Sequence, residues 1–233
     1  MGMRTSLVMM LTLMVGWTMP SHAGSGHGAE HSAIGHGGHG RHMRLSPKRK
    51  ARAGDREAAR RLARETGRSI QRYRDVAVAR RDGYRVFGDV PEARVIHYVH
   101  LRRSRAERRR IDPERPGSLL YRRERGRLVL IGAMYTAPAG ATPAQLDARV
   151  PLSQARWHLH TNICTPRPIW SKAKWARRFP SGEMVYGAFS PIATLEACKE
   201  VGGRFHRTIL GWMVHVYPFR ADPAAWWKEQ HGR

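Results

Sequence analysis

The chain has 233 residues, of which 42 are Lys or Arg and 18 are Asp or Glu, so its formal net charge is +24. The length fits one or two domains, and a hydrophobic content of 41% is enough for a core, which excludes a wholly disordered chain. Two cysteines exclude a scaffold built on many disulfides.

Residues 1–23 have the pattern of a secretory signal peptide. Arg4 supplies a positive charge ahead of the apolar run 7–15, and Ser21 and Ala23 place small residues at the cleavage positions. The apolar run is shorter than the about 20 residues that span a bilayer. We therefore expect cleavage near Ala23 and a mature protein in the periplasm or outside the cell.

The next segment, residues 24–53, is rich in histidine, glycine and basic residues, and we expect it to be disordered because it carries few apolar side chains. Its histidines are His27, His31, His36, His39 and His42. Neutral imidazoles bind Cu, Zn or Ni, so the segment can capture metal, or it can be a solvated tail with incidental affinity. The remainder, residues 54–233, is expected to form a single α+β domain.

The first predicted element of that domain is a long helix from Asp55 to Gly83, with an apolar side chain every three or four residues. Beyond it the apolar pattern changes to the alternation that is typical of strands. Strands are expected at 94–101, 118–121, 127–136, 155–164 and 208–217, with a charged loop at 102–110, a turn at 124–126 and a Pro- and Ala-rich connection at 137–151. Short helices are expected at 193–201 and from Asp222 onward.

These elements predict an α+β fold, with a long N-terminal helix, a mainly antiparallel β-sheet core and a short C-terminal helix. Short connections favour antiparallel pairing of consecutive strands. Such a sheet can also curl toward a barrel.

Cys164 and Cys198 are the only cysteines of the chain. Because exported compartments are oxidising, we expect a disulfide between them. The alternative is that Cys164, which follows His160 on the same predicted strand, is a metal ligand.

Four histidines in predicted strands are the candidate metal ligands. His158 and His160 alternate with Trp157 and Leu159, so both imidazoles point to one face of the strand. Two imidazoles on a rigid strand are a common way to bind a metal. His97 and His215 lie in other apolar strands and can join them across the sheet, although strand histidines are also frequent as ordinary core or surface residues.

The segments Leu130-Ile131-Gly132-Ala133-Met134-Tyr135 and Trp157-His158-Leu159-His160 resemble the oil-body-associated protein family and its bacterial relatives, which share a Leu-Ile-Gly-x-Glu-Tyr strand followed by Trp-His-x-His. The similarity covers residues 73–217. It implies a shared fold and a shared metal-like site, and brings no established activity. This chain departs from the family pattern at Met134, which stands where the family has glutamate.

The donor types favour copper or zinc over harder ions. Carboxylates are scarce after residue 128, so a Ca²⁺ or Mg²⁺ site with six or more oxygen ligands is not expected. Imidazoles suit Cu or Zn, and Met134 would make the site softer if it contributes, although it can equally be a core residue.

Three classes of function follow. The first is an exported metal-binding protein that uses the four strand histidines and the His-rich segment. The second is a metal-dependent enzyme with the same histidines, for which the sequence supplies no standard catalytic motif and no substrate. The third is a basic protein that binds acidic envelope polymers or anionic lipid surfaces. Few aromatic residues accompany the basic segments, so specific nucleic-acid binding is not expected; the oligomeric state is left open.

Overall fold

The computed structural model describes residues 41–87, 95–169 and 171–228 of the chain. The predicted signal peptide and residues 24–40 of the His-rich segment lie outside the described residues.

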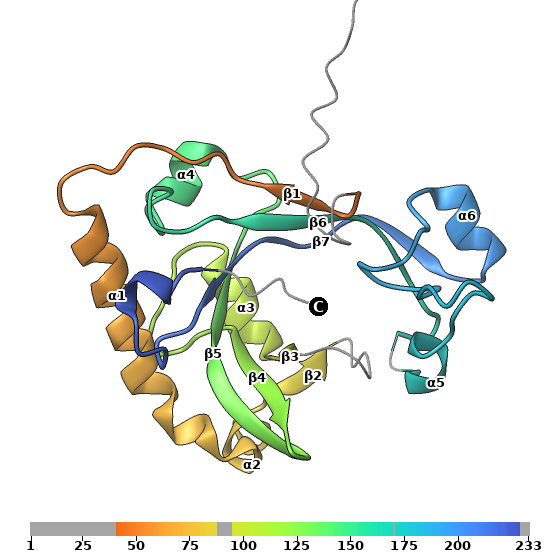
Figure 1. Ribbon diagram of the computed structural model, residues 1–233, viewed down its shortest axis with the longest axis horizontal. Coiled ribbons are helices and arrows are strands. Elements are labelled where there is room, and N and C mark those ends of the chain that lie inside the picture. The colour runs from red at the N-terminus through yellow and green to blue at the C-terminus, as the bar shows by residue number, and fades with distance from the viewer. Residues whose placement is uncertain (1–40, 88–94, 170, 229–233) are drawn as a thin grey trace, which may run out of the picture. The chain divides into compact units, whose positions relative to one another are not determined.

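The described residues form an α+β fold around one seven-stranded antiparallel sheet, as predicted (Figure 1). Its strands are β1 (Met43–Leu45), β2 (Arg85–Phe87), β3 (Val95–Val99), β4 (Ser118–Glu124), β5 (Arg127–Ala137), β6 (His158–Thr165) and β7 (Arg204–Val216). Their order is β1-β6-β7-β5-β4-β3-β2, so β1 and β2 are the edges and the sheet does not close into a barrel.

The helices are short apart from the first one. They are α1 (Asp55–Ile70), α2 (Val76–Arg81), α3 (Leu101–Glu107), α4 (Pro143–Asp147), α5 (Lys172–Trp175) and α6 (Leu195–Glu200), with 3-10 turns η1 (Gln71–Arg74) and η2 (Pro223–Ala225). Within the described residues, none of these helices has the length and the apolar character needed to cross a membrane.

The helix predicted from Asp55 to Gly83 is divided into α1, η1 and α2. The break lies at Asp75, whose backbone is extended and whose side chain accepts a hydrogen bond from the amide of Ala77, which caps α2. An aspartate that caps a new helix competes with continuation of the old one. The predicted end is confirmed, because Gly83 has a φ of 94°, a conformation that glycine adopts without strain.

Two segments predicted to be irregular contain helices. The charged loop at 102–110 is largely α3, which lacks an apolar stripe and buries only Glu107. The connection at 137–151 contains α4, which Thr142 and Gln145 begin with a capping box. In both cases local capping and helix-forming residues, rather than apolar spacing, determine the helix.

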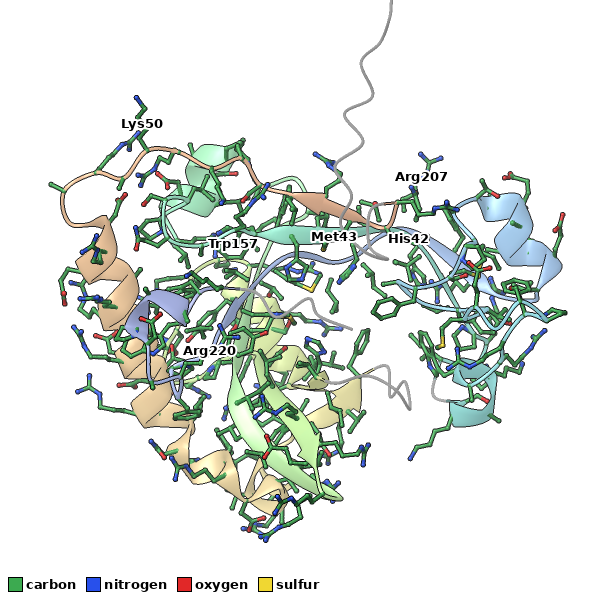
Figure 2. All side chains as sticks on the ribbon, in the orientation of Figure 1. His42, Met43, Lys50, Trp157, Arg207 and Arg220 are labelled. Carbon is green, nitrogen blue, oxygen red and sulfur yellow. A yellow bond between two sulfur atoms is a disulfide. The ribbon has the colours of Figure 1, made fainter. Side chains whose placement is uncertain are left out.

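The prediction of disorder for residues 24–53 is wrong for the last part of that segment. Met43–Leu45 form the edge strand β1 on β6 (Figure 2). His42 and Ser46 beside it are fully buried. His42 Nε2 is 2.7 Å from the carbonyl oxygen of Ser190, and Ser46 Oγ accepts a hydrogen bond from the amide of Trp157. A strand of three residues is below the length at which alternation is visible, so its partner strand, not its own pattern, establishes it.

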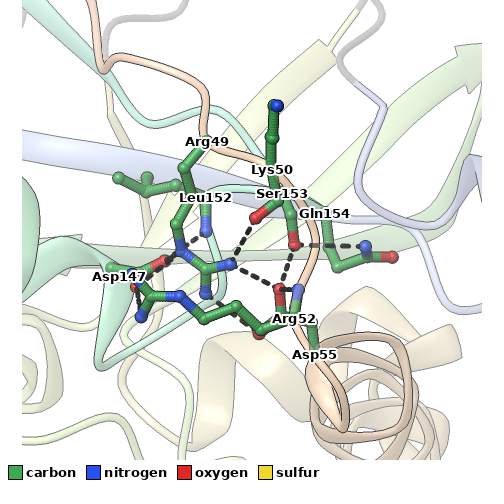
Figure 3. Close-up of polar contacts among 8 residues, drawn as sticks. All are labelled: Arg49, Lys50, Arg52, Asp55, Asp147, Leu152, Ser153 and Gln154. Atoms are coloured by element: carbon green, nitrogen blue, oxygen red, sulfur yellow. Dashed lines mark hydrogen bonds and ion pairs between the residues drawn. The ribbon is translucent and has the colours of Figure 1, made fainter.

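Helix α1 is joined to the rest of the fold by a charged cluster centred on Arg49 (Figure 3). Its guanidinium group contacts Asp55 at the start of α1 and Asp147 at the end of α4, with N–O distances of 2.5 and 2.7 Å. Ser153 also donates a hydrogen bond to Asp55. The arginine holds the pKa of the Asp55 carboxyl far below its usual value through these hydrogen bonds.

The two faces of the sheet bury different sets of side chains. One face packs against α1 in the main apolar core, which includes Tyr135, Trp157 and Val214. The opposite face carries a smaller cluster of Leu120, Met134, Met213 and Tyr217. Because successive side chains on a strand alternate between faces, the residues next to this smaller cluster are the predicted histidines.

Candidate metal centre

The four predicted histidines lie on the same face of the sheet. Residues directly opposite each other in an antiparallel ladder share a face of the sheet. The register pairs each of the four histidines with residues on the face opposite the main core. The pairs are His97 with Leu120 and Phe87, His158 with Met213 and Leu45, His160 with Ile209 and Met43, and His215 with Met134. All of these partners are apolar or thioether side chains.

The rings themselves come together across the sheet. The Nε2 atoms of His97 and His215 are 3.4 Å apart. The ring of His158 lies 5.0 Å from that of His215 and 5.2 Å from that of His160, measured between centroids. The structure therefore brings these imidazoles close together, as the alternation along the strands predicts.

This convergence requires a bent sheet. Strands β4 and β5 lie between β3, which carries His97, and β7, which carries His215. Three strand spacings of about 4.8 Å separate the two backbones by about 14 Å in a flat sheet. The contact between the rings therefore shows that this face is concave, with the two side chains leaning toward each other.

A bulge in β7 accompanies the bend. Leu159 and His160 are adjacent on β6, but their partners Trp212 and Ile209 are separated by Leu210 and Gly211. Both intervening residues have positive φ, 63° and 91°. A positive φ is costly for leucine, and such strain is concentrated where a fold positions functional groups. Bulges of this kind redirect the side chains beside them, and here the neighbour is His160.

Burial keeps the central imidazole neutral. His158 is 1% exposed, and desolvation lowers its pKa to about 4. An imidazole with that pKa is unprotonated at neutral pH, which is the form that binds metal.

His215 is held in place by Tyr217. A hydrogen bond of 3.2 Å joins the tyrosine hydroxyl to Nδ1 of His215, and the Arg220 guanidinium lies over the tyrosine ring, 4.1 Å from its centroid. A partner on one ring nitrogen orients the other nitrogen, as the outer contacts of metal-binding histidines do. In His215 that other nitrogen is the Nε2 that faces His97.

These residues fit a metal in their chemistry and in part of their geometry. Two nitrogens bound at about 2.0–2.1 Å to one tetrahedral ion lie about 3.4 Å apart, which is the separation of the His97 and His215 Nε2 atoms. Within the part of the chain that the structure describes, no group of three His, Cys, Asp or Glu side chains is placed to hold one ion as it stands. A third ligand would need a movement of a neighbouring side chain.

The two cysteines lie away from this place and form the expected disulfide. Cys164 and Cys198 are bonded, with an S–S distance of 2.00 Å, beside a small core that includes Trp175 and Tyr186. The alternative that Cys164 is a thiolate metal ligand is therefore wrong.

The sequence places His42 among the histidines of the tail, but in the structure it has another role. It is buried between the carbonyl groups of Thr161 and Ser190 and attaches β1 to the fold. Sequence reasoning also missed Tyr217 and Met213 as neighbours of the histidines. Their alternation with His215 on one strand, at spacing two, is the signal that could have identified them.

Comparisons of the chain with protein-family models, with curated proteins and with solved structures give no match. The resemblance of residues 73–217 to the oil-body-associated protein family therefore stays a prediction.

Proposed function

We propose that this chain is an exported metal-binding protein that holds Cu or Zn at the cluster of His97, His158, His160 and His215. One observation carries the proposal: the His97 and His215 Nε2 atoms, 118 residues apart in sequence, lie 3.4 Å apart. That is the separation expected of two ligands of one tetrahedral ion.

The surroundings of the rings support a metal more than an ordinary core. Two of the four rings, those of His158 and His215, are buried, and the cross-strand neighbours of all four are apolar or thioether side chains. His158 is neutral at pH 7 because it is desolvated, and Tyr217 orients His215. The disulfide is compatible with export.

Within this proposal the His-rich segment 24–40 is a capture arm. Its four histidines can bind metal loosely and raise the local metal concentration near the structured site. Because these histidines also bind metal on their own, any test of the structured site has to remove them.

The test uses the full chain with His27, His31, His36 and His39 changed to Ser. We expect this protein to bind one equivalent of Zn²⁺ or copper, measured by elemental analysis after desalting. The double variant His97→Ala/His215→Ala should lose that equivalent, because each substitution removes one of the proposed metal ligands.

The matched control is His206→Ala. His206 is also a strand histidine on β7, but its Nε2 pairs with the Thr165 hydroxyl, outside the cluster. Retention of the metal in His97→Ala/His215→Ala, or an equal loss in the control, would overturn the proposal.

A second candidate function is binding of an acidic polymer, and a specific cleft favours it. The cleft of about 690 Å³ lies between α1, the 108–113 segment and α4, and its basic lining residues are Arg61, Arg108, Arg109, Arg110 and Arg149. Arg149 is bound to backbone carbonyl groups. In the described part of the chain the other four have no ion-pair partner.

The polymer candidate predicts affinity for a polyanion such as dextran sulfate that falls steeply with salt. Arg108→Ala/Arg109→Ala/Arg110→Ala should weaken binding more than Arg122→Ala/Arg123→Ala/Arg125→Ala, which removes the same charge from the β4–β5 hairpin. Equal effects of the two triple variants in a binding titration would show that binding depends only on net charge and that the cleft is not the binding site.

A further inference from the structure

Three methionines stand directly opposite three of the cluster histidines. The register pairs Met43 with His160, Met134 with His215 and Met213 with His158. Side chains at such positions share a face and have Cβ atoms about 4.5–5.5 Å apart. Each of these imidazoles therefore has a thioether as its cross-strand neighbour.

Two of the three thioethers are buried. Met134 is 1% exposed and Met213 is 3% exposed, and both belong to the small apolar cluster with Leu120 and Tyr217. They lie on adjacent strands, with β7 carrying both Met213 and His215. The sulfur atoms are thus built into the concave face on which the histidines converge.

Within the described residues, the cysteines and the buried carboxyl near this face have other partners. Both cysteines are in the disulfide. Glu107 is the carboxyl buried on this face, and it accepts hydrogen bonds from the Gly117 amide and from the amide and hydroxyl of Thr136. In the described part of the chain, the donors that the register places opposite one another on this face are imidazoles and thioethers.

We infer that this site selects Cu(I), with the thioethers of Met134 and Met213 as ligands beside the imidazoles; this rests on the proposed metal-binding function. Thioether sulfur is a soft donor that selects Cu(I), whereas zinc in proteins takes thiolate, imidazole and carboxylate ligands. The electrostatic cost of burying an ion rises with the square of its charge. A donor set of imidazoles and thioethers, which carries no negative charge, therefore favours a monovalent ion over a divalent one.

The thioethers also supply what the imidazoles lack. In the described residues no three His, Cys, Asp or Glu side chains are placed around one ion. Met134 pairs with His215, one of the two histidines whose Nε2 atoms are 3.4 Å apart. Methionine has three rotatable bonds and adapts easily to its surroundings, so its sulfur can complete the coordination without a shift of the backbone.

The experiment compares Cu(I) and Zn²⁺ in the same protein, the full chain with His27, His31, His36 and His39 changed to Ser. Cu(I) is held by ascorbate without oxygen and its affinity is measured by competition with bicinchoninate; Zn²⁺ affinity is measured by competition with a zinc chelator. The variant is Met134→Leu/Met213→Leu, because leucine conserves apolar volume. The control is Met184→Leu, whose sulfur accepts a hydrogen bond from Arg178 outside the cluster.

We expect Met134→Leu/Met213→Leu to weaken Cu(I) binding by at least about tenfold, because loss of even an outer contact of a metal ligand has an effect of that size. Zn²⁺ binding should be unchanged. The sulfur contribution to the copper X-ray absorption spectrum should disappear in this variant and persist in Met184→Leu. A circular dichroism melt confirms that the variants are folded.

Two failures are distinguishable. If the unsubstituted site binds neither ion, the proposed function fails. If it binds metal but Met134→Leu/Met213→Leu keeps its Cu(I) affinity, or the spectrum shows no sulfur, the proposed function stands and the inference of thioether ligation is overturned.

Discussion

At the scale of single residues, the carboxyl of Glu107 is the clearest case of chemistry imposed by the fold. Glu107 is 1% exposed, and desolvation raises the pKa of its carboxyl to about 8, against smaller opposing effects from its hydrogen bonds and from Arg149. The Thr136 hydroxyl, which donates to an ionised Glu107, accommodates the protonated form by reversal of this hydrogen bond: the carboxyl then donates to the hydroxyl, and the hydroxyl donates to the Ser104 carbonyl oxygen. Glu107 is therefore neutral in the folded protein at pH 7.

This pKa predicts a loss of stability as the pH rises. The folded carboxyl titrates near 8 and the unfolded one near 4.5, so between these values the folded state binds the extra proton. The contribution of Glu107 is complete below about 4.5 and is lost as the pH rises through 8, at up to about 1.4 kcal/mol per pH unit. The effect of Glu107 on stability is best measured in the window between pH 6.5 and 8. Below pH 6.5 His158, whose pKa is lowered in the folded state, also contributes to the pH dependence.

The measurement is the free energy of unfolding by urea across that window. Glu107→Gln, which cannot ionise, should lose the downward slope whatever its absolute stability. Glu114→Gln, at an exposed position, should keep it. Identical slopes in the wild type and Glu107→Gln would contradict the assignment.

At the scale of elements, the fold depends on side chains that attach one segment to another. Arg49 connects the segment after β1 to the start of α1 and the end of α4 (Figure 3). Its side chain is 20% exposed and that of Asp55 9%, whereas Arg52 is 72% exposed and reaches Asp147 only at 3.8 Å. The two arginines thus differ in burial and share an acidic partner.

We expect Arg49→Met to lower the melting temperature more than Arg52→Met does. It should also move acid unfolding to a higher pH. The Asp55 carboxyl has a lowered pKa because Arg49 binds it, so its contribution is present above about 3.8, the unfolded value, and is lost only at more acidic pH. Circular dichroism from pH 2 to 7 measures both effects, and an equal acid midpoint in the two variants would contradict the role of Arg49.

The same scale shows how far elements follow from sequence. The strands at 118–121 and 127–136 and their turn were predictable because apolar alternation and the Arg125-Gly126 pair are local signals; both residues have positive φ. Helix α3 and strand β1 were not, since the first lacks an apolar face and the second is held by contacts with β6 and Ser190.

At the scale of the whole molecule, the structure separates the histidine face from the disulfide. Cys164 pairs in register with Phe205 near the start of β7, whereas His215 and Met213 lie near its end. The disulfide closes a sequence separation of 34 residues around its own small core. Stability at one place and metal binding at the other should therefore be separable.

Cys164→Ala/Cys198→Ala should destabilise the protein by about 4 kcal/mol, since a crosslink of that span restricts the unfolded chain. For a protein of this size the melting temperature should fall by roughly 10 °C. Metal stoichiometry in the background without tail histidines should be unchanged. A variant that remains folded but loses its metal would show that the disulfide and the histidine face are coupled.

By itself the sequence determined the α+β class and the antiparallel sheet, because alternation and spacing are properties of neighbouring residues. The presence of two cysteines in an exported chain predicted the disulfide, and alternation placed the four histidines on strands. Only the tertiary structure decided that the rings of His97 and His215 meet and that His42 belongs to the fold. It also decided that Met134 and Met213 face the histidines. Strand order, register and the bend of the sheet create these contacts, and they depend on pairings between segments far apart in the chain.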